Sequence, residues 1–286
     1  LGLSGRQGAH RWQAGASAER ARVSYEQTEQ EGNFSASRGV EPLAGEDPEL
    51  SAAVRGTSRT LGVYVSDTWQ LQPATHLTGT LRLNEARVSN TLTSVDDDTD
   101  EIRERPTESF RYRSLNPALG LVHRIDGGLA VFGNVARNTR VPTVIELGCA
   151  DPAEPCRLPA GLQADPYLKQ VRSTTVEAGL RWGSMTGTGG SVTAYRTDNR
   201  DDIVFRAVSV TGQRGYFQNV ERTRHQGVDA EWRWRSPMLD LAVMASHLDA
   251  TYQFDGLLRM GERNVLIRPG TRIAGLPSQQ LKLSAD

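Results

Sequence analysis

The chain has 286 residues, and its 33 basic and 34 acidic side chains give a formal net charge of −1, so no overall positive field indicates nucleic-acid binding. Mean hydropathy is −0.48 and no run of about 18 apolar residues occurs, which excludes a helical membrane protein but not a transmembrane β-barrel. No compositional break divides the chain, so we expect one domain over residues 1–286.

Segments that alternate apolar and polar residues recur along the whole chain and predict about ten long strands. After the end of a strand at Leu1–Ser4 and a turn at Gly5–Gly8, they are His10–Tyr25, Thr57–Leu71, His76–Asn90, Phe110–Arg124, Leu129–Asn138, Ser173–Trp182, Ser191–Phe205, Gly215–Arg235, Leu239–Phe254 and Gln279–Asp286. The expected fold is all-β and antiparallel.

The stretch Ser173–Arg235 shows the alternation most clearly, because its strands carry charges on one parity and Val, Ala, Leu and Trp on the other. Side chains alternate faces along a strand, and charges are costly against lipid. We therefore expect a lumen- or plug-facing set made of Glu177, Arg181, Asp229, Glu231, Arg233 and Arg235. The simpler interpretation, that any water-filled lumen is polar, also accounts for each residue taken singly.

Short and long connections alternate along the chain. Short turns are expected at Gln72–Thr75, Ile125–Gly128, Gly183–Gly190 and Ser236–Met238, and most of the other connections are long, among them Glu26–Gly56, Thr139–Arg172 and Asp255–Pro277. An up-and-down outer-membrane barrel has this one-sided arrangement. Trp69, Trp182, Trp232 and Trp234 lie beside short turns, where we expect membrane-interface aromatics.

Several passages resemble the barrel of TonB-dependent outer-membrane receptors. They include the strand end Arg140-Val141-Pro142-Thr143, the loop-to-strand passage Asp165–Gln170 followed by Glu177–Trp182, the segment Tyr216–Val220 with Gln226–Asp229, and Gly275-Leu276-Pro277 before Leu281. Asp165 and Gln170 stand where the family pattern has Asn and Pro. The resemblance covers roughly residues 59–286.

This resemblance implies a barrel of about 22 strands closed by a plug domain, of which the chain supplies an incomplete, internal piece without the plug domain and the C-terminal strands. It implies active uptake of a scarce nutrient, most often a ferric siderophore, across the outer membrane of a Gram-negative bacterium. The implied partners are outer-membrane lipid, a small-molecule or metal-chelate ligand, and the TonB complex, reached through an N-terminal region that this chain lacks. A passive porin or secretion-type barrel, and a soluble secreted β-sandwich that binds glycans, are the alternatives.

Two further features concern loops. Cys149 and Cys156 are the only cysteines, and a pair in an exported loop predicts a disulfide; a metal site there lacks nearby His ligands. The carboxylates Asp96, Asp97, Asp98, Asp100 and Glu101 could hold a cation, but they lack the calcium-loop spacing, which favours a solvated loop.

No catalytic or nucleotide-binding motif occurs, and the five histidines are scattered. We therefore predict a protein that is not an enzyme and has neither a cofactor nor a protein-bound metal.

Overall fold

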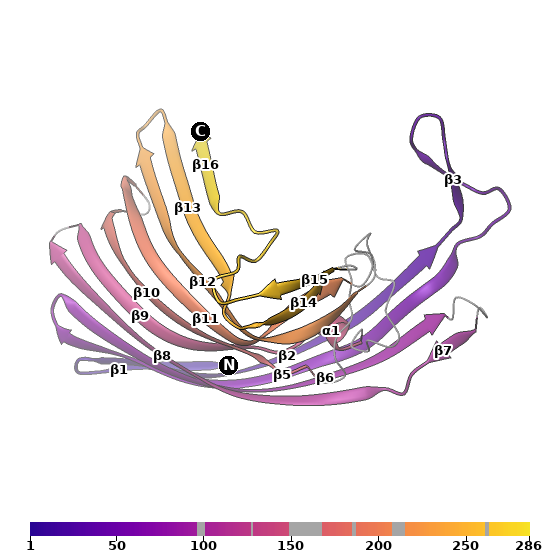
Figure 1. Ribbon diagram of the computed structural model, residues 1–286. Coiled ribbons are helices and arrows are strands. Elements are labelled where there is room, and N and C mark those ends of the chain that lie inside the picture. The colour runs from indigo at the N-terminus through magenta and orange to yellow at the C-terminus, as the bar shows by residue number, and fades with distance from the viewer. Residues whose placement is uncertain (96–100, 127, 149–167, 185–186, 208–214, 261–262) are drawn as a thin grey trace.

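The structure is a computed structural model that describes residues 1–286 except 96–100, 127, 149–167, 185–186, 208–214 and 261–262. Among the described residues one antiparallel sheet of twelve strands dominates (Figure 1). In spatial order its path is β1 (Gly2–Gln7), β2 (His10–Glu29), β5 (Glu49–Gln72), β6 (Thr75–Val95), β8 (Glu108–Asp126), β9 (Leu129–Arg140), β10 (Val171–Gly183), β11 (Gly189–Ala207), β12 (Gly215–Arg235), β13 (Asp240–Tyr252) and β16 (Gln279–Ala285), with β7 (Ile102–Glu104) beside β6.

The sheet curls into part of a barrel that stays open between β1 and β16, its two edge strands (Figure 1). Each long strand pairs antiparallel with the one that follows it around the curve, so the predicted all-β, up-and-down architecture is confirmed. Alternation and the pairing of consecutive strands both depend on residues that are close in the sequence, so the sequence pattern was sufficient to predict them.

The two faces of the sheet follow from the pairing register. Val176 lies opposite Val135, and Leu180 lies opposite Val131 and Val192, on what we call the outer face. Glu177 lies opposite Asn134 and Tyr195, on what we call the inner face. The inner face is the concave side of the curled sheet, and inner side chains from β9 to β16 line a single cavity on it (Figure 1).

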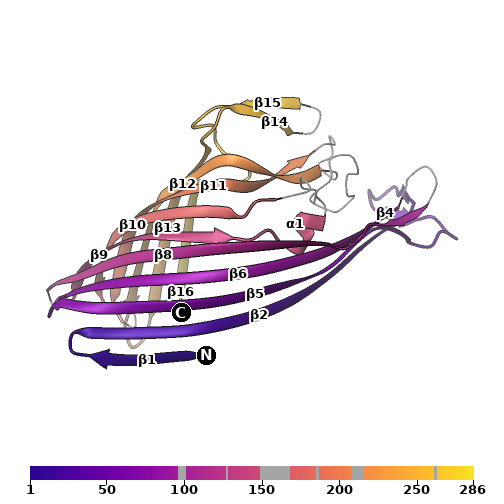
Figure 2. The same ribbon diagram turned by 90° about the horizontal axis from the view of Figure 1, so that it is seen from below.

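The short turns all lie at one end of the sheet and the long connections at the other, which Figure 2 shows as a clean separation. At the long-loop end the strands extend further than the alternation indicated. β2 continues to Glu29 and β5 already begins at Glu49, within the predicted loop Glu26–Gly56. A register shift at Gln27 and Thr28 breaks the parity there, which is why the alternating pattern ends before the strand does.

The long loops contain structure of their own, which the sequence analysis did not predict. β3 (Gly32–Phe34) pairs with β4 (Val40–Pro42), and β14 (Gly256–Met260) pairs with β15 (Arg263–Ile267). A short helix, α1 (Val144–Gly148), follows β9. No helix among the described residues has the length and apolar content needed to cross a membrane.

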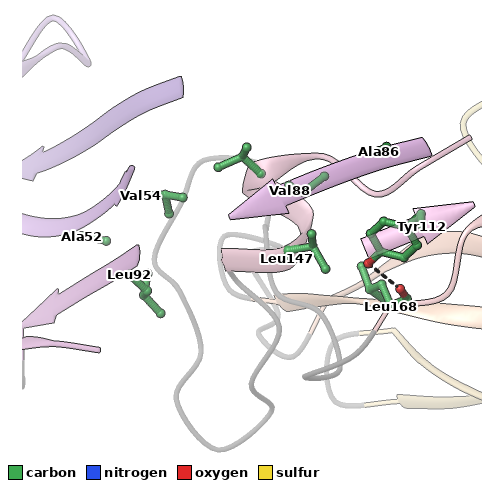
Figure 3. Close-up of a cluster of buried hydrophobic side chains, with 9 residues drawn as sticks. Ala52, Val54, Ala86, Val88, Leu92, Tyr112, Leu147 and Leu168 are labelled. Atoms are coloured by element: carbon green, nitrogen blue, oxygen red, sulfur yellow. Dashed lines mark hydrogen bonds between the residues drawn. The ribbon is translucent and has the colours of Figure 1, made fainter. Parts of the chain in front are cut away.

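Helix α1 packs on the inner face of β5 and β6, and its buried side chains belong, with Tyr112 of β8, to the larger buried apolar cluster of the described chain (Figure 3). Leu147 is 1% exposed and Leu168 is completely buried. The close approach requires Gly56, since a Cβ there would lie 2.5 Å from Cγ1 of Val144 and 2.1 Å from the Ser89 carbonyl oxygen. The cluster fixes the start of the β9–β10 connection against the barrel wall. Its buried residues are Ala52, Val54, Ala86, Val88, Leu92, Tyr112, Val144, Leu147 and Leu168.

Candidate functional site

A cavity of about 620 Å³ lies on the inner face between β9 and β16. Four of the six predicted lumen-facing residues line it, because they share one parity on neighbouring strands: Glu177, Arg181, Asp229 and Glu231. Tyr195 of β11 and Lys282 of β16 also line it, together with the uncharged polar residues Ser191, Thr193, Ser246 and Gln280. Three carboxylates and two cations therefore face one space.

The three carboxylates of this cavity are held by neutral donors. Asn134 donates a short hydrogen bond to Glu177, the Ser246 hydroxyl donates to Asp229 over 2.6 Å, and the Ser191 hydroxyl donates to Glu231 over 3.1 Å. Among the described residues none of the three makes an ion pair. Neutral donors fix the position of a carboxylate without placing a cation in contact with it, so the set can receive cationic groups from a partner inside the barrel.

Arg181 is positioned by an aromatic ring. Its guanidinium lies 5.7 Å from the ring centroid of Phe132, within the range of a cation–π contact. The Phe132 ring in turn lies over Gly179, where a Cβ would come within 2.6 Å of it. A glycine opposite the aromatic residue thus lets the ring lie flat along the wall and support the arginine.

The other two predicted residues, Arg233 and Arg235, lie nearer the short-turn end and share one counter-ion. Both guanidiniums bind Asp240 at the start of β13; Nε of Arg233 lies 2.8 Å from Oδ1, and Nη2 of Arg235 lies 2.7 Å from Oδ2. Asp240 was missed in the sequence analysis because only the β12–β13 register, which places it opposite Arg235, brings it to these arginines.

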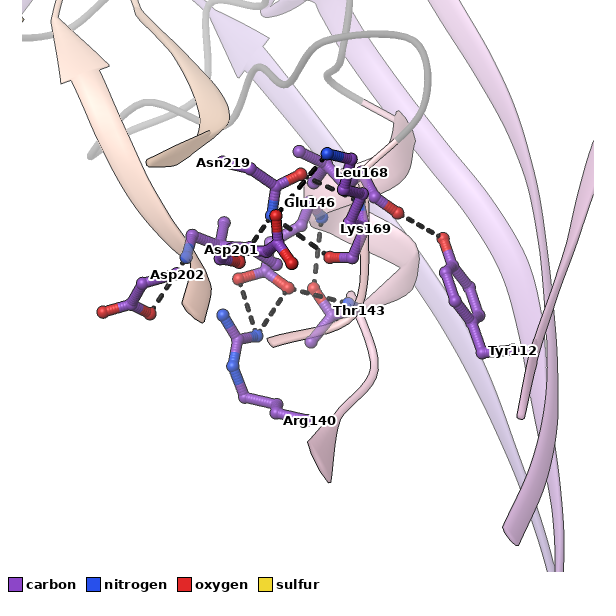
Figure 4. Close-up of polar contacts among 10 residues, drawn as sticks. Tyr112, Arg140, Thr143, Glu146, Leu168, Lys169, Asp201, Asp202 and Asn219 are labelled. Carbon is purple, nitrogen blue, oxygen red and sulfur yellow. Dashed lines mark hydrogen bonds and ion pairs between the residues drawn. The ribbon is translucent and has the colours of Figure 1, made fainter. Parts of the chain in front are cut away.

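At the long-loop end a polar network holds both ends of the β9–β10 connection (Figure 4). At its start, Thr143 and Glu146 form a reciprocal capping box, with Glu146 accepting from the Thr143 backbone N–H over 2.7 Å and Thr143 accepting from that of Glu146 over 3.1 Å. Arg140 adds a hydrogen bond of 2.9 Å to each oxygen of Glu146.

The end of the same connection is held by Asn219 of β12. Its side chain accepts from the Lys169 backbone N–H over 2.8 Å and donates to the carbonyl oxygens of Lys169 and Asp201. Three passages on which the family resemblance was based, at Arg140–Thr143, Leu168–Lys169 and Asn219, therefore meet in one place (Figure 4). The network anchors the loop whose centre, residues 149–167, lies outside the described residues.

We expect Tyr112→Phe to release the end of this loop. The buried Tyr112 hydroxyl donates to the Leu168 carbonyl oxygen over 2.9 Å, and losing that donor leaves a buried acceptor unsatisfied at a cost of about 1–3 kcal/mol. Limited proteolysis between residues 149 and 167 should accelerate by about 5- to 150-fold if opening precedes cleavage. The control is Tyr64→Phe, which lies on the same inner face but on β5 rather than β8. An equal change in both variants would contradict the anchoring role.

The predicted interface tryptophans all lie at the short-turn end on the outer face. Trp182 and Trp232 flank Gly190 from either side, and Trp69 stacks on His10 with ring centroids 5.6 Å apart. Trp234 lies opposite Leu241. Trp12, which the prediction omitted, lies at the same end opposite Asp67; its position shortly after the turn at Gly8 was the available signal.

The loop predictions lie largely outside the described residues. Cys149 and Cys156 and the carboxylates Asp96, Asp97, Asp98 and Asp100 belong to segments that the structure does not describe. Glu101 is described and lies 3.7 Å from Arg103. Within the described part of the chain, no group of three or more His, Cys, Asp or Glu side chains is arranged to hold a metal ion.

Comparison with known proteins agrees with this architecture. The family model described as "TonB dependent receptor-like, beta-barrel" matches residues 2–286. No curated protein matches the sequence significantly.

Among solved structures, the ferric yersiniabactin uptake receptor FyuA from Yersinia pestis superposes with a TM-score of 0.66 at 16% identity over 98% of this chain and 37% of its own. The siderophore receptor PiuA from Acinetobacter baumannii gives 0.64 at 13% identity over 99% and 42%. The copper transporter OprC gives 0.61 at 14% identity over 87% and 36%. The chain thus spans about two fifths of the length of these structures.

Proposed function

Because the chain belongs to the TonB-dependent receptor β-barrel family, we propose that it forms part of the barrel of an outer-membrane receptor for the active, TonB-driven uptake of a small-molecule or metal-chelate ligand. The barrel architecture and the transport-receptor family are incompatible with the alternative of a soluble β-sandwich. We propose no catalysed reaction, because transport needs binding and conformational change rather than bond making.

The observation that carries the proposal is the set of charges of both signs on the inner face that make no ion pair among the described residues. A passive pore needs only a polar lumen, in which water hydrates the charged side chains. The three carboxylates and Arg181 around the cavity are instead held in place by Asn134, Ser246, Ser191 and Phe132. Preorganised charges of both signs suit a folded partner with complementary charges inside the barrel, which we propose is the plug domain.

The ligand we propose is a ferric siderophore. By their names, two of the three similar structures are a ferric yersiniabactin uptake receptor and a siderophore receptor. The third is a copper transporter, so copper is the second candidate. The anchored β9–β10 loop and the β14–β15 hairpin lie at the end of the barrel from which an external ligand would arrive (Figure 2).

In the membrane we propose that the tryptophan end faces the periplasm and the long loops face the outside of a Gram-negative cell. In that oxidising setting we propose a disulfide between Cys149 and Cys156, which would stabilise the loop by about 2–3 kcal/mol.

The uptake proposal predicts TonB-dependent accumulation of radiolabelled ferric siderophore by iron-starved cells that express the receptor. Deleting the receptor should reduce uptake to background, and restoring it should restore uptake only in cells with TonB. Labelled copper is the parallel substrate. Uptake that persists without TonB would instead establish the passive porin, and no uptake of either label would contradict the ligand assignment.

A further inference from the structure

Four arginines form a straight row across four adjacent strands. The register places Arg20 of β2 opposite Arg59 of β5, Arg59 opposite Arg87 of β6, and Arg87 opposite Arg111 of β8. All four are exposed. Directly opposite residues in a sheet have Cβ atoms about 4.5–5.5 Å apart, and like charges at such positions destabilise the pairing.

The row lies on the outer face. Toward the short turns on the same parity, Leu61 follows Arg59 directly, whereas Glu85 and Arg113 come between the row and Leu83 and Leu115. The three leucines are 45–61% exposed. The row therefore borders the apolar surface that meets lipid on the side of the long loops. None of its arginines faces the cavity of the inner face.

The depth of the row matches the outer edge of a membrane. Ten residues separate Arg59 from Trp69 on β5, a distance of about 33 Å along a strand. With the usual tilt of about 40° this is about 25 Å in height, which is the height of the apolar band of outer-membrane barrels. With the tryptophans at one interface, the arginines reach the headgroups at the other.

The row lacks sufficient counter-charge in the protein. Glu85 accepts Arg111 at 2.6 Å, Arg113 at 3.0 Å and Arg87 at 3.4 Å, so one carboxylate serves three guanidiniums. Within the described residues, Arg20 and Arg59 have no ion pair. A net positive strip of this kind requires anions from outside the chain to offset its self-repulsion.

Two shallow grooves adjoin the row on the outer face. One, of about 470 Å³, is lined by apolar side chains of β5, β6 and β8 and is bordered by Glu85 and Arg113. The other, of about 420 Å³, contains Arg22 and Arg55 together with the hydroxyls of Ser24, Thr57, Ser89, Thr91 and Thr107. From the short-turn side to the long-loop side, the surface therefore presents an apolar groove, the guanidiniums and a hydroxyl-rich groove. This order matches the order of parts in a lipid: acyl chain, phosphate, polar headgroup.

From this juxtaposition we propose that the outer face of β2, β5, β6 and β8 is a binding site for an outer-leaflet lipid whose headgroup carries more than one phosphate. Arg59, Arg87 and Arg111 bind the phosphates, and an acyl chain lies along Leu61, Leu83 and Leu115. Guanidiniums bind phosphate oxygens through paired N–H donors, and basic clusters at a membrane surface select anionic lipids. The inference rests on the outer-membrane placement in the proposed function.

The test titrates the detergent-solubilised receptor with bis-phosphorylated lipid A, with its mono-phosphorylated form and with inorganic phosphate, and measures bound lipid by native mass spectrometry. We expect the triple variant R59Q/R87Q/R111Q to bind bis-phosphorylated lipid A about 100-fold more weakly. The matched control R6Q/R11Q/R124Q, which removes three inner-face arginines near the short turns, should bind like the wild type. Inorganic phosphate at the same concentration should not compete, because it lacks the acyl chain.

A second variant changes binding in the opposite direction and does not depend on how well the triple variant folds. Glu85→Gln frees three guanidiniums, and we expect tighter binding of bis-phosphorylated lipid A. Unchanged affinity in both variants, an equal loss in the control, or full competition by inorganic phosphate would overturn the proposal. Flotation of the wild type with phosphatidylcholine vesicles tests the membrane placement separately from the lipid site. Failure to float refutes the membrane placement. Flotation with no change of lipid A affinity in the arginine variants refutes only the lipid site.

Discussion

Replacing Val65 with arginine should destabilise the membrane-inserted receptor by about 2–4 kcal/mol, the cost of an arginine near the midplane on the lipid face of a barrel. Val65 is 49% exposed on the outer face, between Ala14 and Leu81. It lies four residues from Trp69, close to half the height of the apolar band. Urea unfolding from phosphatidylcholine vesicles, followed by the heat-modifiable mobility of the folded barrel, measures the change.

The control for this variant is its neighbour. Ser66→Arg places the same charge at the same depth on the inner face, where Ser66 shares a hydrogen bond of 2.8 Å with the Thr80 hydroxyl. The inner face already carries Arg82 at a similar depth, in contact with Asn84 and Ser17. We expect Ser66→Arg to cost less than about 1 kcal/mol. Equal destabilisation by the two variants would mean that the two faces do not meet lipid and lumen as assigned.

Removing the inner-face carboxylates should weaken the association of the barrel with a plug domain supplied as a separate chain. In the variant with Glu177→Gln, Asp229→Asn and Glu231→Gln, each amide keeps the size of the carboxyl and loses its charge. We expect the dissociation constant to rise about 100-fold, or about 3 kcal/mol. Surface plasmon resonance with immobilised plug gives the value, and the effect should shrink at high salt.

A comparison variant uses two charges that already have a counter-ion within the barrel. Arg233→Gln with Arg235→Gln removes two arginines that bind Asp240. Because those charges are occupied, we expect a smaller loss of plug affinity, below about tenfold. A larger loss than in the carboxylate variant would show that Asp240 releases its arginines to the plug, and no loss in either variant would contradict the plug interface.

Alternation, turn chemistry and the order of connections were readable from the sequence because each is a property of a few consecutive residues. The parity of Glu177 and Arg181, or of Asp229 and Glu231, depends only on the two-residue repeat of a strand. The same repeat is lost at the long-loop end, where β2 ends in the polar residues Glu26–Glu29 and its register with β5 shifts. The ends of β2 and β5 and the two extra hairpins were therefore not predicted. Helix α1 is too short to show a helical period.

The sequence by itself determined that this chain forms long antiparallel strands with a charged and an apolar face, short turns marked by tryptophan at one end, and long loops at the other. Only the tertiary structure decided which distant residues meet. Asp240 reaches Arg233 and Arg235 across a strand pair, Asn219 closes the β9–β10 loop, and Arg20, Arg59, Arg87 and Arg111 form one row. The physical reason is register: a shift of one strand by two residues keeps each side chain on its face of the sheet but changes its partners. Such a shift of β12 would separate Asp240 from its arginines, and the same shift of β5 would break the arginine row.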